Sequence, residues 1–503
     1  MDLHLLIMSL LRSFCFRYDG YYKYAAPTEL KNRLVRNRFQ LFFQFAVLFL
    51  FFFFAITVRA EDKPVSYYHD LVPILKRSCT GCHHPGKLKA ELDLTTYELF
   101  KKGGKHGESF SAGDPKKGTL IENITGDEPD MPKEGDPLTK VEVAMFERWI
   151  KEGATDDTPE EAKNPFKLSK LPEYAAPPVI SAMSFSPDGN VLAISGYHEV
   201  LLHKSDGSGS IARLMGESPR IESIAFSPDG KSLVVAGGAP SRFGEIQIWN
   251  VASHAQLKSF KISPDTLYGA TFSPDGKRIA FGGADKAVRV ISAEDGKEIV
   301  KFENHGDWTF GAVFTQNGQR ILSCSRDRAM KLIDASSGQF IDDVNNLLEP
   351  ILCFARNAKN DLIVYGGELG TPRIYRISDN QNRGQGNTKR DANLVREFER
   401  QPSPVHAVAW SPGGSRIVVG GNGEARIYLA SDGKRTATLK GNEGAIFAIA
   451  FHPANNQVAT GGFDGSVRIF DSASGNLVTN FIPVTITAAK RVAKAPSETS
   501  SAK

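Results

Sequence analysis

The chain has 503 residues, of which 41% are hydrophobic and 23% are charged. This is a globular composition, and the chain is too long for one hydrophobic core, so two or three domains are expected. The formal net charge of +4 gives no reason to expect a nucleic-acid partner. Among the five cysteines, Cys324 and Cys353 lie in apolar, strand-like stretches. They are predicted to be buried free thiols rather than a disulfide.

Residues 1–60 are predicted to form a leader. Basic residues at 33, 36 and 38 precede an apolar stretch at 41–58, and a small residue, Ala60, is followed by the charged residues 61–63. This order is typical of a secretory signal cleaved after Ala60. An uncleaved anchor is the alternative, because the stretch has about the 18 residues that span a bilayer. Either way the protein is expected to be exported, free in the periplasm or anchored facing it.

Cys79, Cys82 and His83 form the pattern C-x-x-C-H, which is the attachment signature of a c-type haem. Two thiols one turn apart can each form a thioether with a haem vinyl group, and the imidazole is then the proximal ligand of the iron. A zinc site is the alternative, but it needs further ligands at paired spacing. Because the sequence has no second cysteine pair, one covalently attached haem c is predicted.

Two helices are expected around the motif. The first runs from Asp70, the predicted cap, to Ser78 and leads into the cysteines. The second covers 138–150, and Thr139 with Glu142 three residues later forms a capping box. Apolar residues at helical spacing give this second helix one buried face: Val141, Met145, Phe146, Trp149 and Ile150. The two helices are predicted to pack on each other and on the haem edge.

Met131 lies in the loop-rich segment between these helices and is followed by Pro132. A thioether on a rigid loop is the usual sixth ligand of an electron-transfer haem. His106, in a loop of glycine and lysine, is the next candidate, whereas Met145 is better explained as core. Met131 is therefore the predicted distal ligand of the iron, opposite His83.

Residues 70–154 resemble the planctomycete-type cytochrome c domain. The matching segments, in order, are Val72-Pro73-Ile74-Leu75, the haem motif, Leu92-Asp93-Leu94, Gly103-Gly104, Gly113-Asp114-Pro115, Leu120-Ile121, Met131-Pro132 and Trp149-Ile150-Lys151-Glu152-Gly153-Ala154. The resemblance implies that Cys79 and Cys82 attach the haem and that His83 and Met131 bind its iron. Two positions depart from the family pattern: His84 stands where glycine is usual, and Lys133 replaces a second proline.

The cytochrome domain is predicted at 61–156, and a polar, proline-containing linker at 157–177 follows it. From 178 to 484 the chain repeats. The pattern F-S-P-D-G begins at 185, 226 and 272, and weaker copies begin at 314, 354, 410 and 451. This period and four strands per unit are typical of WD40 repeats. The region resembles the WD40 family, which implies an all-β propeller of seven blades. The longest unit contains 379–391, a predicted protruding loop, and 485–503 is a predicted disordered tail.

The predicted third strands each carry a basic residue in five of the units: Arg289, Lys331, Arg373, Arg426 and Arg468. We expect solvated strand positions, and a basic ring facing a partner is the alternative. His305 is expected to make a structural hydrogen bond. No arrangement of nucleophile and base, paired carboxylates or phosphate loop is present in a credible context, so the protein is not predicted to be an enzyme.

These patterns predict a multidomain protein, with a small all-α cytochrome c domain followed by an all-β propeller. The predicted function is an exported monohaem c-type cytochrome that carries single electrons, with the propeller as a protein-docking platform. The expected partners are a protein redox partner or a protein ligand of the propeller, with a possible membrane tether through the N-terminal apolar segment. Two alternatives are a peroxidase-like haem enzyme with an open sixth position and a propeller scaffold with a structural or sensory haem.

Overall fold

The computed structural model describes residues 63–85, 87–345, 349–378 and 392–487. The predicted leader at 1–60 and the predicted loop at 379–391 lie outside the described residues, as do residues 488–503 of the predicted tail. Residues 66–503 form a unit separate from residues 1–65. Among the described residues, no helix has both the length and the apolar character needed to cross a membrane.

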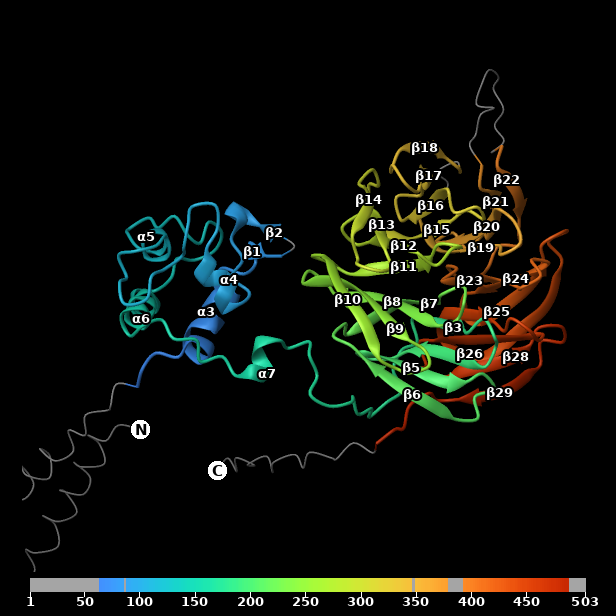
Figure 1. Cartoon of the computed structure of the whole chain (residues 1–503), viewed down its shortest axis with the longest axis horizontal. Helices are drawn as coiled ribbons and strands as arrows, with labels where there is room; N and C mark the ends of the chain where they lie inside the picture. The colour runs from blue at the N-terminus through green and yellow to red at the C-terminus, as the bar shows by residue number, and fades with distance from the viewer. Residues whose placement is uncertain (1–62, 86, 346–348, 379–391, 488–503) are drawn as a thin grey trace, which may run out of the picture. The chain divides into compact units, whose positions relative to one another are not determined.

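Residues 66–157 form a small helical part (Figure 1). Its elements are η1 (Tyr67–Leu71), α3 (Val72–Ser78), β1 (His83–His84), β2 (Lys87–Leu88), η2 (Lys89–Glu91), α4 (Tyr97–Lys102), α5 (Leu120–Ile124) and α6 (Lys140–Lys151). The expected all-α arrangement did not include the β1–β2 pair, whose register places His83 opposite Leu88.

The first helical segment begins earlier than predicted. Ser66, not Asp70, is its cap, because the Ser66 hydroxyl accepts the backbone N–H of His69 at 2.8 Å. Asp70 lies inside the first turn, and its carboxylate accepts the backbone N–H of Ser66 at 2.9 Å. The prediction was wrong because two polar side chains share the capping of this turn, and the sequence does not rank them.

An aromatic core holds the helical part together. Trp149 of α6 packs against Tyr67, Phe100 and Phe110, with ring centroids 5.4, 6.2 and 4.8 Å away, respectively. All four side chains are buried, and such pairs add about 0.5–1.5 kcal/mol each beyond the area they bury. Val141, predicted on the same stripe, is 70% exposed. The buried face of α6 is therefore confined to its second half.

Residues 183–481 form antiparallel sheets. Five sheets have four strands each. They are β3 (Met183–Phe185), β4 (Val191–Ser195), β5 (Glu199–Lys204) and β6 (Ser210–Met215); β7 (Arg220–Phe226), β8 (Ser232–Ala239), β9 (Phe243–Asn250) and β10 (Gln256–Ser263); β11 (Leu267–Phe272), β12 (Arg278–Gly283), β13 (Val288–Ser292) and β14 (Glu298–Phe302); β15 (Thr309–Phe314), β16 (Arg320–Ser325), β17 (Met330–Asp334) and β18 (Phe340–Asp343); and β19 (Ile351–Arg356), β20 (Leu362–Gly367), β21 (Arg373–Arg376) and β22 (Leu394–Glu397).

The last sheet has seven strands. They are β23 (Ala407–Trp410), β24 (Arg416–Gly420), β25 (Asn422–Leu429), β26 (Arg435–Phe451), β27 (Gln457–Gly462), β28 (Val467–Asp471) and β29 (Leu477–Phe481). The first strands of the successive sheets, together with β26, line a central cavity of about 1010 Å³. The repeat region is therefore mostly β, as expected of WD40 repeats (Figure 1).

The repeated pattern F-S-P-D-G forms the turn between the first two strands of a sheet. In the second sheet the Ser227 hydroxyl donates to the Asp229 carboxylate at 2.6 Å and accepts the backbone N–H of Ser232 at 2.9 Å. In the fifth sheet the equivalent turn begins at Asn357, whose N–H donates to the Leu362 carbonyl. Arg356, rather than the predicted Phe354, therefore occupies the aromatic position of that repeat.

The two ends of the repeat region meet. Ile180, Met183 and Leu192 of the first repeat pack with residues of the last sheet, including Ala459 and Ile469. Outside the sheets, the carbonyl of buried Tyr174 accepts the backbone N–H of Thr487 at 2.8 Å. A residue of the predicted linker thus pairs with the first residues of the predicted tail, so neither segment is unstructured at this point.

The five basic side chains of the third strands are neither solvated nor arranged as a free ring. They are only 5–13% exposed, and each forms an ion pair with an acidic side chain: Arg289 with Asp285, Lys331 with Asp343, Arg373 with Glu349, Arg426 with Glu424 and Arg468 with Asp464. Both predictions, a solvated position and a free basic ring, were wrong. Asp285, Glu424 and Asp464 lie two or four residues before their partners, whereas Asp343 and Glu349 come from more distant segments.

The structural role predicted for His305 is confirmed. Its Nδ1 lies 2.8 Å from the Asp327 carboxylate, and its Nε2 lies 2.8 Å from the Ser323 hydroxyl. Burial raises the pKa of the Asp327 carboxyl, but hydrogen bonds from His305 and from the backbone of Ala329 outweigh it and lower the pKa from 3.8 to about 2.

This lowered pKa predicts a loss of stability in acid. A carboxyl whose pKa is lower in the folded state stabilises the fold above pH 3.8, and the contribution is lost as the pH falls towards 2. We expect roughly 2 kcal/mol of the free energy of unfolding to disappear over this range. Urea unfolding at several pH values should show a smaller loss for Asp327→Asn than for the wild type. An equal loss in Asp327→Asn would assign the acid sensitivity to another group.

Candidate functional site

The haem motif forms a tight turn at the end of α3. The backbone N–H of Cys79 donates to the Leu75 carbonyl at 2.9 Å, and the N–H groups of Cys82 and His83 both donate to the Cys79 carbonyl, at 3.1 and 3.3 Å. Cys79 and Cys82 are free thiols. Cys324 and Cys353 are also free thiols, as predicted. The turn therefore runs from Cys79, the cap at the end of α3, to His83, the first residue of β1.

The His83 side chain is buried and has one fixed orientation. Its Nδ1 lies 3.1 Å from the Lys89 carbonyl oxygen. Because a carbonyl only accepts, Nδ1 carries the proton and Nε2 is left with its lone pair. A histidine that binds a metal commonly has its other nitrogen held in this way. The main chain of His83 is also fixed, since its carbonyl accepts the N–H of Leu94 at 3.0 Å.

The two motif sulfurs lie in different surroundings. Burial raises the pKa of the Cys79 thiol to about 11, although Arg77 nearby opposes the shift. The Lys87 ammonium donates to Cys82 Sγ at 3.3 Å. Burial disfavours a thiolate at Cys79, but a thioether has no proton to lose, so the same burial does not oppose the attached form.

Met131 lies on a separate loop, between α5 and α6. Its backbone N–H donates to the Asn123 carbonyl at 2.8 Å, and a cis peptide bond joins it to Pro132. The Met131 side chain is half-buried. Within the described residues, no hydrogen bond links Met131 directly to the motif, so its pairing with His83 across a haem stays a prediction. Of its rivals, His106 is exposed in a turn and Met145 is half-buried on α6.

The residues of the motif fit a haem better than a zinc ion. Two thiols and one neutral imidazole with its Nδ1 already engaged are what covalent haem attachment requires. A zinc site needs four ligands, and no group of three or more histidine, cysteine, aspartate or glutamate side chains in the described part of the chain could hold a metal ion.

An ion pair ties the motif helix to α6. Arg77 donates to the Glu142 carboxylate at 2.6 Å, and the predicted capping box is confirmed, because Glu142 also accepts the backbone N–H of Thr139 at 2.8 Å. The hydrogen bond from Arg77 is the main reason that the pKa of the Glu142 carboxyl lies below its ordinary value of 4.5.

This pairing predicts an acid-sensitive contact between the two helices. Glu142 stabilises the fold above pH 4.5, and the contribution is lost as the pH falls through the lower, folded pKa. We expect Glu142→Gln to lower the amide protection of residues 140–151 at pH 7 by about 0.5–1 kcal/mol. Hydrogen exchange, corrected for intrinsic rates, should show a smaller difference near pH 3. Glu147→Gln, on the same helix, is the control, and an equal effect in both variants would contradict the assignment.

The sequence did not indicate the group that orients His83. That group is the main-chain carbonyl of Lys89, and a backbone acceptor leaves no signature in the choice of side chain. Lys87 and Lys89 are both exposed. Their positive charge, close after the motif, is visible in the sequence alone.

The fold and the motif define the class of protein: a small domain of the cytochrome c type, joined to a region of WD40-type β-sheets. The comparisons are specific for both parts. Residues 79–135 match the Planctomycete cytochrome C family. Residues 255–292, 296–334, 392–428 and 433–471 match the WD domain, G-beta repeat. The chain therefore carries a planctomycete cytochrome c domain together with WD40 repeats.

Similar curated proteins cover only part of the chain. F-box-like/WD repeat-containing protein TBL1X of Mus musculus is 29% identical over 137 residues, which are 26% of this chain and 25% of that protein. TBL1Y of Homo sapiens is also 29% identical over 137 residues, 26% of each chain. Denticleless protein homolog of Danio rerio is 28% identical over 86 residues, 17% of this chain and 13% of that protein. The chain thus spans about a quarter or less of the length of these relatives.

Proposed function

We propose that this protein is an exported monohaem c-type cytochrome that carries single electrons, and that its propeller docks a protein partner. The observation that carries the proposal is the turn at Cys79–His83, in which the Lys89 carbonyl holds Nδ1 and leaves Nε2 to bind. The match of residues 79–135 to the Planctomycete cytochrome C family supports the same assignment.

In this proposal the chain supplies four ligating or attaching side chains. Cys79 and Cys82 would hold the haem through thioethers, and His83 and Met131 would bind its iron. The haem supplies reversible one-electron exchange. The Lys89 carbonyl keeps the imidazole in one orientation, and the hydrogen bond between Met131 and Asn123 holds the main chain of the Met131 loop. If His83 and Met131 both bind the iron, no position on it would be left for a substrate, so we propose that the protein is not an enzyme.

We also infer seven blades. The strand β26 has 17 residues; its first part pairs with β25 and its second part with β27. If β26 is shared, the seven-stranded sheet is two four-stranded blades that join at this strand. Added to the five separate sheets, this gives the seven repeats that the sequence indicates. We propose that the cytochrome domain covers 61–156 and the propeller 178–484.

An ultraviolet–visible redox titration of the mature protein tests this function. We expect one reversible one-electron step and, in the ferric state, the band near ~695 nm that a methionine ligand gives; high-spin ferric iron would instead favour the peroxidase-like alternative. Met131→Ala should remove the band, whereas Met145→Ala should leave it. Recovery of the protein from the periplasmic fraction, cleaved after Ala60, tests export. Absence of haem from the mature protein would overturn the proposal.

A further inference from the structure

A short segment beside the haem motif presents two cations and one apolar side chain. Lys87, Leu88 and Lys89 are all exposed, and Leu88 is 49% exposed. Leu88 is paired in register with His83, and Lys87 donates to Cys82 Sγ. We call these three residues the hairpin surface. Its position is fixed by hydrogen bonds to the same residues that would hold the haem.

More lysines extend the positive charge of the hairpin surface. The backbone N–H of Lys105 donates to the Ala90 carbonyl at 2.8 Å, which brings the end of α4 alongside the residues after the hairpin. The lysines at 101, 102 and 105 are exposed. No ion pair in the described part of the chain neutralises these three or the two lysines of the hairpin surface. The acidic residues in the same stretch, at 91, 93 and 98, are fewer than the lysines.

The loop that carries Met131 has the opposite charge. Its exposed acidic residues are Asp127, Glu128, Asp130, Glu134 and Asp136, and the one basic residue there, Lys133, is already paired with Asp130. Figure 1 shows β1 and β2 at one edge of the helical part and α5, which holds the Met131 loop, at the other. A negatively charged partner is therefore attracted to the edge of the helical part that carries β1 and β2 and repelled from the edge that carries α5.

We propose that the hairpin surface is the docking site for an acidic patch on a redox partner protein, which rests on the electron-carrying function proposed above. Leu88 provides the apolar centre and the lysines provide the charged rim, the arrangement found in protein interfaces. Complementary charge of this kind raises the rate of encounter more than the final affinity. The carboxylates interspersed among the lysines favour a patterned protein surface over a uniformly anionic bilayer.

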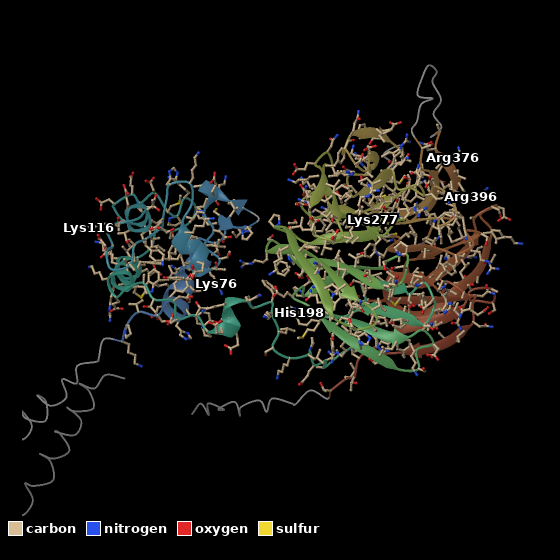
Figure 2. The ribbon with its side chains drawn as sticks, in the orientation of Figure 1. Lys76, Lys116, His198, Lys277, Arg376 and Arg396 are labelled. Carbon is tan, nitrogen blue, oxygen red and sulfur yellow. The ribbon has the colours of Figure 1, made fainter. Side chains whose placement is uncertain are left out.

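Small redox probes of opposite charge test the site on the full, haem-loaded protein. The variant Lys87→Glu/Lys89→Glu should slow oxidation by hexacyanoferrate(III) about tenfold at low ionic strength and speed oxidation by tris(phenanthroline)cobalt(III). Both effects should shrink at high salt, because exposed charges are then screened. Lys116→Glu/Lys117→Glu makes the same change of charge on a different surface and should alter both rates less than about twofold. Figure 2 labels Lys116 across the helical part from Lys76 of α3.

A binding measurement supplies the readout that does not depend on electron transfer. Titration with poly-L-glutamate should perturb the amide signals of residues 87–89 in the wild type, and this response should be lost in the hairpin variant. Midpoint potentials of all variants are measured, so that a change of driving force is separated from a change of encounter rate.

The outcomes separate this proposal from the function on which it rests. A protein that carries no haem overturns both. A protein that carries haem and cycles normally, but responds equally to the hairpin and control variants, overturns the docking site and leaves the function standing. Binding to phosphatidylglycerol vesicles that is lost in Lys87→Glu/Lys89→Glu would also overturn the proposal and assign the surface to a membrane.

Discussion

Replacing Cys79 and Cys82 together by alanine is expected to abolish covalent haem attachment. Without both thiols no thioether can form, so the denatured protein should lose its haem stain and its mass should fall to that of the bare polypeptide. Mass spectrometry and haem staining of the protein, expressed with residues 1–60, measure this directly.

The chain offers a matched control for the cysteine variant. Cys324→Ala/Cys353→Ala removes the other two described cysteines, which are free and lie in the repeat region, and it should keep the full haem mass. The aromatic cluster around Trp149 does not include the motif cysteines. We therefore expect the haem-free variant to retain helical structure by circular dichroism. Covalent haem in the double alanine variant would contradict the attachment site.

Replacing Arg373 by methionine is expected to be the most destabilising change in the propeller. Arg373 is paired with Glu349, whose side chain has no exposed surface, and it also donates to Glu397 at 2.8 Å and to the Tyr365 hydroxyl at 3.1 Å. These partners raise the pKa of the arginine despite its burial. Its removal leaves the Glu349 carboxylate buried without a counter-charge, which costs about 3–5 kcal/mol.

Urea unfolding, followed by tryptophan fluorescence, measures this loss. Arg376→Met is the matched control, since Arg376 lies on the same strand, β21, and is exposed; Figure 2 labels it. It should change the free energy of unfolding by less than about 0.5 kcal/mol. The double variant Arg373→Met/Glu349→Leu should recover most of the stability, because it removes the uncompensated charge. Equal losses in the single and double variants would show that packing, not charge, governs this site.

The features that sequence predicted are local. The haem motif, the capping box of Thr139 and Glu142, and the turn at Ser227–Asp229 each lie within five residues, and the structure places them as expected. In such cases the sequence spacing determines the geometry, because the residues share one turn.

Two features that sequence did not predict depend on contacts between distant residues. Glu349 and Arg373 are 24 positions apart, and Tyr174 and Thr487 are 313 positions apart. Arg373 was predicted to be solvated, but its ion pair with Glu349 holds it in a buried position. The Lys89 carbonyl that orients His83 escapes prediction for another reason, because any residue at position 89 would supply it.

The contact between Tyr174 and Thr487 has a consequence for how this protein could have been assembled. The first and last sheets of the propeller pack together, and the segments that lead into and out of it lie side by side. The two ends of the repeat region are therefore neighbours. Domains with adjacent ends tolerate transfer into other chains and rearrangement of their order. A gene segment encoding residues 174–487 would therefore include both ends of the repeat region, and it could be joined to a different domain without opening the ring.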